Sequence, residues 1–334
     1  MRKTMGCWLL AGSLLTGATT ALAGSGYEKH PLAQEVLAAL EAEGFTAEEI
    51  EAVLAKAERK DSILEAISRP AERRLTWGEY RKIFVEPKRI RQGAAFWNEH
   101  ADTLARAEET YGVPAEIIVS IIGVETRYGR IMGNYRVLDA LATLGFDYPK
   151  RADFFRGQLI EFLRMTREEA LDPTDPMGSY AGAMGYGQFI PSSFRNFAVD
   201  FDGDGKRNIW TNKVDAIGSV ANYFHAHGWK PGEPVRSNVV FNQTADAEWF
   251  NAGLKPQVTL AEWAERGVAT RKDLPLEQPA TLMELTMDDG DQHWFGLHNF
   301  YVITRYNHSR LYAMAVYELS QEIRAARDAG AKEK

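Results

Sequence analysis

One segment in the first half of the chain restricts the fold more than any other, because it is apolar on nearly all sides when written as a helix. It follows Pro114, and its branched apolar residues cover every face: Ile117, Ile118, Val119, Ile121, Ile122 and Val124. A helix without a polar face is stable only when other parts of the protein surround it. We therefore expect it to be buried, in a chain whose 334 residues suffice for two or three domains and a large core.

Helical patterns dominate from residue 30 to about residue 229. Two helices begin with capping boxes, in which a threonine and the glutamate three residues later accept each other's backbone N–H, at Thr46–Glu49 and Thr76–Glu79. Residues 96–112 are predicted to form one longer helix that ends at Gly112.

The sequence changes character over residues 232–302, where β-branched and aromatic residues become frequent. Within this range Asp289-Gly290 is typical of a hairpin turn. A last helix is predicted from Ser309 to Ala326, before a short tail at 329–334. The predicted fold class is mainly α (α+β), with a small β-rich insertion.

The first 23 residues are predicted to be a secretory signal peptide. Arg2 and Lys3 precede an apolar stretch that ends in the cleavage pattern Ala21-Leu22-Ala23, so the mature chain should begin near Gly24. A membrane anchor is the alternative, but the stretch is short and interrupted by glycine and threonine. The single cysteine, Cys7, precedes most of the apolar region, so lipid anchoring is not expected.

The charge balance excludes one class of function. The formal net charge is −7, and removal of the signal peptide, with its two basic and no acidic residues, lowers it to −9. A nucleic-acid-binding protein needs a basic surface. We therefore expect no nucleic-acid partner.

Glu125 stands near the end of the apolar helix, shortly before Gly129. A carboxylate that leaves a buried helix loses solvation, and its pKa should rise. A raised pKa suits a general acid at neutral pH. The alternative is a structural glutamate paired with Arg127 or Arg130.

A glycine-rich stretch, residues 178–194, could form a carbohydrate site. Glycines permit close backbone approach. Its aromatic residues could stack on sugar rings, and two polar residues could bind hydroxyls: Tyr180, Tyr186 and Phe189, with Ser179 and Gln188. The alternative is a glycine-rich turn before a helix.

The stretch DFDGDG resembles the start of a calcium loop. Asp200, Asp202 and Asp204 fall at positions 1, 3 and 5, and Gly205 at position 6, where such loops turn sharply. Position 12, however, is Thr211 instead of a bidentate glutamate. An acidic turn without metal is the alternative.

Taken together, several long motifs resemble one known family. These are IIGVETRYGRIMGNYRVLDALATL, YAGAMGYGQFIPSSF, DFDGDG with DAIGSVANYFHAHGW, and ITRYNHS with YAMAVYEL. In this order they are similar to the membrane-bound lytic murein transglycosylase B family, glycoside hydrolase family 103. The likeness covers most of the mature chain.

The resemblance implies a lysozyme-like catalytic core at 103–231, containing an EF-hand-like loop. A helical N-terminal domain (24–102) and the β-rich domain (232–302) would flank this core, and residues 303–328 would return to it. The family cleaves the β-1,4 bond between N-acetylmuramic acid and N-acetylglucosamine in peptidoglycan, without water, and leaves 1,6-anhydromuramic ends. The resemblance also implies a periplasmic monomer whose partner is the peptidoglycan glycan strand.

For individual residues, the resemblance implies that Glu125 acts alone, first as acid and then as base. Matching positions in the substrate cleft are Ser179, Gln188, Tyr306, Asn307 and Tyr312, and the basic residues near it are Lys150 and Arg151. Structural Ca²⁺ would be held by Asp200, Asp202, Asp204, the Lys206 carbonyl and Asp215. Two other functions remain open: a hydrolytic muramidase of the same fold, and a non-catalytic protein that binds peptidoglycan and calcium.

Overall fold

The computed structural model describes residues 26–69 and 75–332. The expected signal peptide, including Cys7, lies outside these residues. Within them, no helix combines the length and the apolar composition that crossing a bilayer requires.

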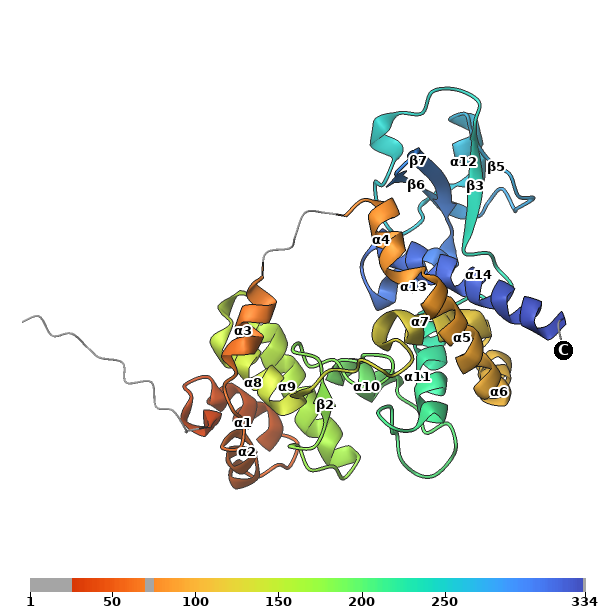
Figure 1. Ribbon diagram of the computed structural model, residues 1–334. Coiled ribbons are helices and arrows are strands. Elements are labelled where there is room, and N and C mark those ends of the chain that lie inside the picture. Colours follow the sequence, from red (N-terminus) through yellow and green to blue (C-terminus); the bar gives the residue numbers. More distant parts are fainter. Residues whose placement is uncertain (1–25, 70–74, 333–334) are drawn as a thin grey trace, which may run out of the picture.

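A first group of helices packs around one apolar cluster at one end of the molecule (Figure 1). It consists of α1 (Ala33–Glu41), α2 (Ala47–Leu54), α3 (Asp61–Ser68), α8 (Val137–Asp147), α9 (Ala152–Glu168) and α10 (Pro191–Phe197). The helix pair α8 and α9 forms its centre, and α1 and α3 pack against this pair. We call this group the first lobe.

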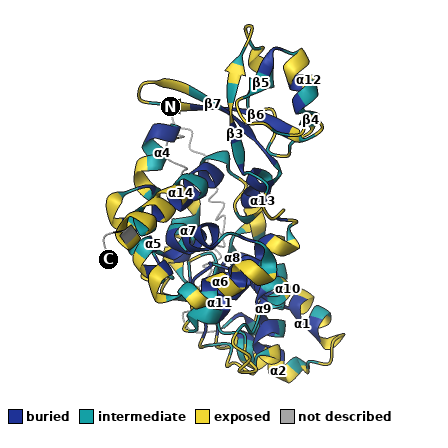
Figure 2. Cartoon of the chain, turned by 90° about the vertical axis from the view of Figure 1, so that its right-hand side faces the viewer, coloured by how far each residue is buried: buried dark blue, intermediate teal, exposed yellow. Residues whose placement is uncertain are grey.

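A second group of helices surrounds α7 and forms the second lobe. It consists of α4 (Trp77–Phe84), α5 (Pro87–Glu99), α6 (Ala101–Tyr111), α7 (Ala115–Thr126), α11 (Lys213–Ala226), α13 (His298–Tyr306) and α14 (Arg310–Lys332). Figure 2 shows α7 largely in the colour of buried residues, with α5 and α14 nearby. The expectation that this helix is buried is confirmed.

A small antiparallel sheet forms the third unit, with the strand order β4-β6-β7-β3-β5. Its strands are β3 (Arg236–Phe241), β4 (Val258–Thr259), β5 (Val268–Thr270), β6 (Pro279–Met287) and β7 (Gly290–Gly296). Successive strand residues point to opposite faces. Leu282 therefore packs in a cluster with α12 (Leu260–Glu265), while Met283 and Leu285 join the second lobe. The sheet is thus anchored to the helical core, and the mainly helical α+β class is confirmed.

Short elements complete the chain and link the lobes. They are the 3-10 helices η1 (Tyr27–Lys29), η2 (Pro149–Arg151) and η3 (Ala247–Trp249), and the strands β1 (Tyr135–Arg136) and β2 (Met177–Gly178). The two short strands pair with each other, with Tyr135 opposite Gly178. This pairing joins the segment after α7 to the glycine-rich stretch.

Local signals for helix ends are confirmed. Both capping boxes form, at Thr46–Glu49 and at Thr76–Glu79. Gly112 ends α6 in the left-handed conformation, with φ of 72°. These features involve only residues close in sequence.

One local prediction was wrong, and another is confirmed with its turn one residue earlier than expected. The helix expected over 96–112 is divided at His100, whose ψ of 28° turns the chain, so that α5 packs on α14 and α6 packs on α11. The β6–β7 turn consists of Asp288 and Asp289, because Met287 pairs with Gly290. Gly290, with φ of 125°, is instead the first residue of β7.

The range 24–102 contains helices of both lobes, since α1–α3 belong to the first and α4–α5 to the second. The proposed return to the core begins within α13, which starts at His298. The domain limits drawn from the sequence therefore remain a proposal.

Candidate active site

Helix α7 carries Glu125 out of the core of the second lobe. The Ser120 hydroxyl, which is completely buried, donates a hydrogen bond of 2.6 Å to the Val316 carbonyl of α14. Glu116, in the first turn of α7, forms an ion pair with Arg324 of α14. The two helices are thus joined by polar contacts as well as by apolar packing, which fixes the position of Glu125.

The chain turns sharply directly after Glu125. Arg127, Tyr128 and Gly129 all have positive φ, at 50°, 61° and 83°. For a bulky residue such as tyrosine this conformation is strained and needs support from its surroundings. The Tyr128 hydroxyl donates to the Arg89 carbonyl at 2.9 Å, and its ring leaves no room for a side chain at Gly123. These contacts stabilise the turn.

Within the described residues, the Glu125 carboxylate accepts one hydrogen bond, which the Tyr312 hydroxyl donates to Oε1 at 2.5 Å. Burial raises the pKa of Glu125 to about 7, and the bond from Tyr312 acts in the opposite direction. Among the described residues, neither Arg127 nor Arg130 forms a salt bridge with it. The structure therefore does not contain the alternative ion pair, and a proton can be held or released at neutral pH.

Two more tyrosines lie close enough to sense the charge of Glu125. Burial raises the pKa of Tyr306 and Tyr80, and the negative charge of Glu125 raises both further. The Tyr306 hydroxyl donates to the Gly187 carbonyl at 2.6 Å, which connects α13 to the glycine-rich stretch. Tyr80 comes from α4, and no local sequence pattern marks it, because it acts on a residue 45 positions away.

The glycine-rich stretch meets the end of α7. The ring of Tyr186 lies against Gly129, where a Cβ atom would approach Cε1 of that ring to 2.1 Å. Gln188 Nε2 donates to the carbonyls of Met132 and Gly185, at 3.2 and 3.0 Å. These contacts place Tyr186 and Gln188 beside the segment that follows Glu125.

The other residues named in this stretch differ in what they offer to a ligand. Ser179 Oγ accepts the backbone N–H of Ala183 at 3.1 Å, so it holds the loop in shape. Tyr180 is 39% exposed, whereas Phe189 is 3% exposed and packs against Tyr306 and Tyr223. The structure therefore leaves Tyr180 free for stacking on a sugar and assigns Phe189 to the core.

Three further predicted residues have no direct contact with the Glu125 carboxylate. Asn307 is exposed and follows α13 directly. Lys150 and Arg151 are exposed in η2, and the Arg151 guanidinium lies 4.4 Å from the ring centre of Phe154. These two cations therefore belong to the first lobe, while Glu125 belongs to the second.

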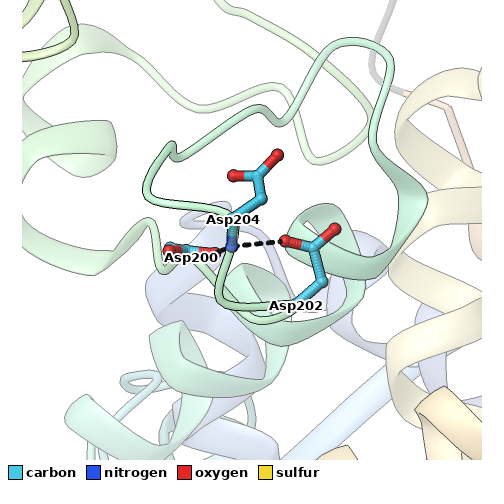
Figure 3. Close-up of side chains that lie close together, drawn as sticks. All are labelled: Asp200, Asp202 and Asp204. Atoms are coloured by element: carbon cyan, nitrogen blue, oxygen red, sulfur yellow. Dashed lines mark hydrogen bonds between the residues drawn. The ribbon is translucent and has the colours of Figure 1, made fainter.

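The acidic loop brings together three of the predicted metal ligands. Oxygen atoms of Asp200, Asp202 and Asp204 lie within 4.8 Å of one another, and all three residues are exposed. Figure 3 shows the Asp204 backbone nitrogen between the other two side chains, donating to Asp200 at 3.1 Å and to Asp202 at 3.2 Å. Oxygen-only ligands at this spacing suit a hard cation such as Ca²⁺.

Asp215 has a different position. It is completely buried, and its two carboxylate oxygens accept the N–H groups of Phe201 and Asn208, each at 2.8 Å. Burial raises its pKa, and these N–H groups oppose that effect. Asp215 thus ties the loop to the start of α11 and does not lie in the cluster of three carboxylates.

Comparisons with known proteins agree on one family. The model of the transglycosylase SLT domain matches residues 28–321. The membrane-bound lytic murein transglycosylase B of Escherichia coli strain K12 is 46% identical over 314 residues, covering 91% of this chain and 86% of the relative.

Two solved structures show the same fold. The catenated lytic transglycosylase SltB1 of Pseudomonas aeruginosa is 55% identical, with a TM-score of 0.87, over 90% of this chain and 99% of that one. The E. coli lytic transglycosylase Slt35 in complex with calcium is 46% identical, with a TM-score of 0.82, over 91% of this chain and 96% of that one. These matches confirm the resemblance drawn from the motifs, so the chain belongs to the transglycosylase SLT domain family.

Proposed function

We propose that this protein is a lytic transglycosylase that cleaves the β-1,4 bond between N-acetylmuramic acid and N-acetylglucosamine in peptidoglycan and leaves 1,6-anhydromuramic ends. The observation that carries the proposal is the state of Glu125, a single carboxylate whose pKa burial raises to about 7. Among the described residues, no second carboxylate contributes to that pKa. Hydrolytic glycosidases generally use two acids that flank the bond.

One carboxyl group suffices if it acts twice. Protonated Glu125 donates its proton to the glycosidic oxygen, the C1–O bond breaks, and positive charge develops at C1. The resulting carboxylate then takes the proton of the muramyl 6-hydroxyl, whose oxygen forms the new bond to C1. Because the pKa of Glu125 lies near neutrality, both its protonated and its ionised form are accessible at pH 7, and each proton transfer can accompany the breaking or forming of the C1–O bond.

Tyr312 favours the ionised state of Glu125 in this cycle. Its hydroxyl donates to Glu125 Oε1, so it stabilises the carboxylate formed after the first proton transfer. Without that bond, burial alone would hold the proton more firmly. Tyr312 is therefore expected to keep the pKa of the acid in a range where Glu125 can also act as the base.

We propose that Tyr180, Tyr186, Gln188 and Asn307 border the sugar site, because they lie on the segments that meet at the end of α7 and at the end of α13. Tyr306 is proposed to shape the same region through its bond to the Gly187 carbonyl. Lys150 and Arg151 are proposed to meet carboxylates of the peptide stems from the first lobe.

We further propose that the loop binds Ca²⁺ as a structural clamp. Its ligands would be the side chains of Asp200, Asp202 and Asp204 and the Lys206 carbonyl. Asp215 would fix the loop by accepting backbone N–H groups of the loop. The proposal is supported by the cluster of three carboxylates and by the calcium complex of Slt35. When bound, the ion would supply positive charge that offsets the repulsion among the three carboxylates.

Export to the periplasm is proposed from the predicted signal peptide and from the location of the substrate. The relative in E. coli is called membrane-bound, so it gives no support to the expectation that this chain lacks a lipid anchor. Fractionation of cells that express the full chain, with Cys7→Ser as the comparison, decides between a free and an anchored protein.

The proposal is tested with Glu125→Gln on suspended murein, by loss of turbidity. Glutamine keeps the shape and the bond from Tyr312 but delivers no proton, so activity should fall by about a hundredfold or more. Glu109→Gln, on the exposed face of α6, is the control and should retain full activity. Retention of more than a tenth of the activity by Glu125→Gln would refute the role of Glu125.

A further inference from the structure

A small pocket with a strongly basic lining lies where β3, the residues after β5 and α14 meet. Its volume is about 160 Å³, and its lining residues are Arg236, Asn238, Arg271, Lys272 and Tyr317. We call it the basic pocket. It gathers three cations and no acid, in a chain whose formal net charge is −7.

Arg236 is held in this lining by two aromatic rings and a hydrogen bond. Its guanidinium lies 4.9 Å from the ring of Trp294 and 5.3 Å from that of Tyr317, and Nη1 donates to Asn238 Oδ1 at 2.7 Å. Its Nε atom is buried and has no hydrogen-bond partner among the described residues. A cation withdrawn from water is normally paired with an anion, because its desolvation is costly.

No carboxylate of the described chain supplies that anion. Glu318 is the one acid whose charge acts on Arg236, but its carboxylate accepts from Arg81 Nε at 2.5 Å. Arg271 and Lys272 are exposed, and neither forms a salt bridge within residues 26–69 and 75–332. The positive charge of the basic pocket is therefore not neutralised from within.

The remaining polar groups of the pocket are also suited to an anion. Asn238 Oδ1, the one amide oxygen among the lining side chains, accepts the hydrogen bond from Arg236. The NH₂ group of Asn238 can therefore donate to a ligand. The Tyr317 hydroxyl can donate as well. Guanidinium and ammonium groups with neutral donors around one small cavity match a ligand that has several acceptor oxygens and a negative charge.

We propose that the basic pocket binds a free carboxylate of the peptide stems of peptidoglycan, a choice of ligand that rests on the proposed function. The sugars of the glycan are uncharged once the stems are amide-linked to them, so the stems carry the carboxylates. Tyr317 follows Tyr312 by five residues on α14, which corresponds to about 7.5 Å along the helix axis and to a rotation of about 140° around it. A stem of four or five residues, at up to about 3.5 Å per residue, is long enough to reach part of the way around the helix.

All proteins in this test carry Lys150→Gln and Arg151→Gln, so that the two cations proposed for the stems in the first lobe do not bind the probe, and wild type here means the chain whose basic pocket is unchanged. The proposal is tested with the double variant Arg271→Gln and Lys272→Gln, which removes two exposed cations and leaves the packed Arg236 in place. The matched control is Lys56→Gln with Arg69→Gln, which removes two cations from exposed positions of the first lobe. Calorimetric titration at low salt uses three probes: a stem tetrapeptide with free carboxylates, the same peptide with every carboxylate converted to an amide, and inorganic phosphate.

The free-acid peptide should bind the wild type and the control equally and the pocket variant about tenfold or more weakly, and the amidated peptide should bind all three weakly. Equal affinity of wild type and pocket variant for the acid, or equal affinity of the wild type for acid and amide, overturns the proposal. Tighter binding of phosphate than of the acid peptide also overturns it, because the pocket would then serve free anions. These titrations need no catalysis, so a chain that fails to cleave murein overturns the proposed function alone.

Discussion

Replacing Glu125 by glutamine should stabilise the protein, and only above a certain pH. Raising the pKa of a carboxyl group from 4.5 to about 7 on folding corresponds to about 3 kcal/mol, since a tenfold change in an ionisation constant is worth about 1.4 kcal/mol. The folded state binds the proton more tightly than the unfolded state does. The stabilisation that comes from this tighter proton binding is therefore complete below pH 4.5 and is lost as the pH rises through 7.

Glutamine has no charge to bury and still accepts from Tyr312, so it should avoid this loss. Urea denaturation of both proteins from pH 4 to pH 9 should give equal free energies of unfolding at the acidic end. Above pH 7 the free energy of unfolding of the variant should exceed that of the wild type by up to about 3 kcal/mol. Glu109→Gln, which changes an exposed carboxyl group of α6, is the control and should give no such gain. A difference between wild type and Glu125→Gln that stays constant over the whole range would refute the raised pKa of Glu125.

Two other predictions concern Tyr312 and the acidic loop. Tyr312→Phe removes a hydrogen bond that lowers the pKa of Glu125, so the loss of activity at alkaline pH should begin about one pH unit higher in this variant. Tyr80→Phe is the comparison and should shift this alkaline limit less. A shift of the limit toward lower pH in Tyr312→Phe would contradict the role of Tyr312. Calcium at about a hundredfold excess over its Kd should stabilise the fold by about 2.7 kcal/mol and raise the melting temperature, and a chelator should reverse this. The double variant Asp202→Ala with Asp204→Ala should lose the response to calcium and keep its activity at low temperature. A melting curve of the wild type that calcium leaves unchanged would count against a structural clamp. A double variant that is folded but inactive would also count against it.

The sequence was informative wherever the deciding interactions are local. The apolar faces of 115–126 predict a buried helix, the capping boxes predict two helix starts, and the spacing of Asp200, Asp202 and Asp204 predicts their convergence. Each of these depends on residues within about one or two turns of each other. Local backbone geometry fixes such relations before any tertiary contact forms.

Features that depend on long-range packing were not predictable in this way. Tyr80 approaches Glu125 only because α4 packs against α14 and the sheet. The break at His100 follows from the different partners of α5 and α6. Asp215 is acidic and suitably spaced for a loop ligand, yet tertiary burial directs both its oxygens to backbone N–H groups. The motif resemblance supplied site residues that no local pattern marks, such as Tyr306 and Tyr312.

The identity of the new chain ends formed from purified sacculi decides whether this protein acts by transglycosylation or by hydrolysis. Mass spectrometry of products taken early in the reaction, in water enriched in ¹⁸O, distinguishes anhydro ends from hydrolysed ends. If Glu125 acts as the single acid and base, the muramic ends should be 1,6-anhydro from the first time point and carry no ¹⁸O. Reducing muramic ends labelled with ¹⁸O as the main early product would show that water attacks C1, and Glu125 would then not act as the single acid and base of a transglycosylase.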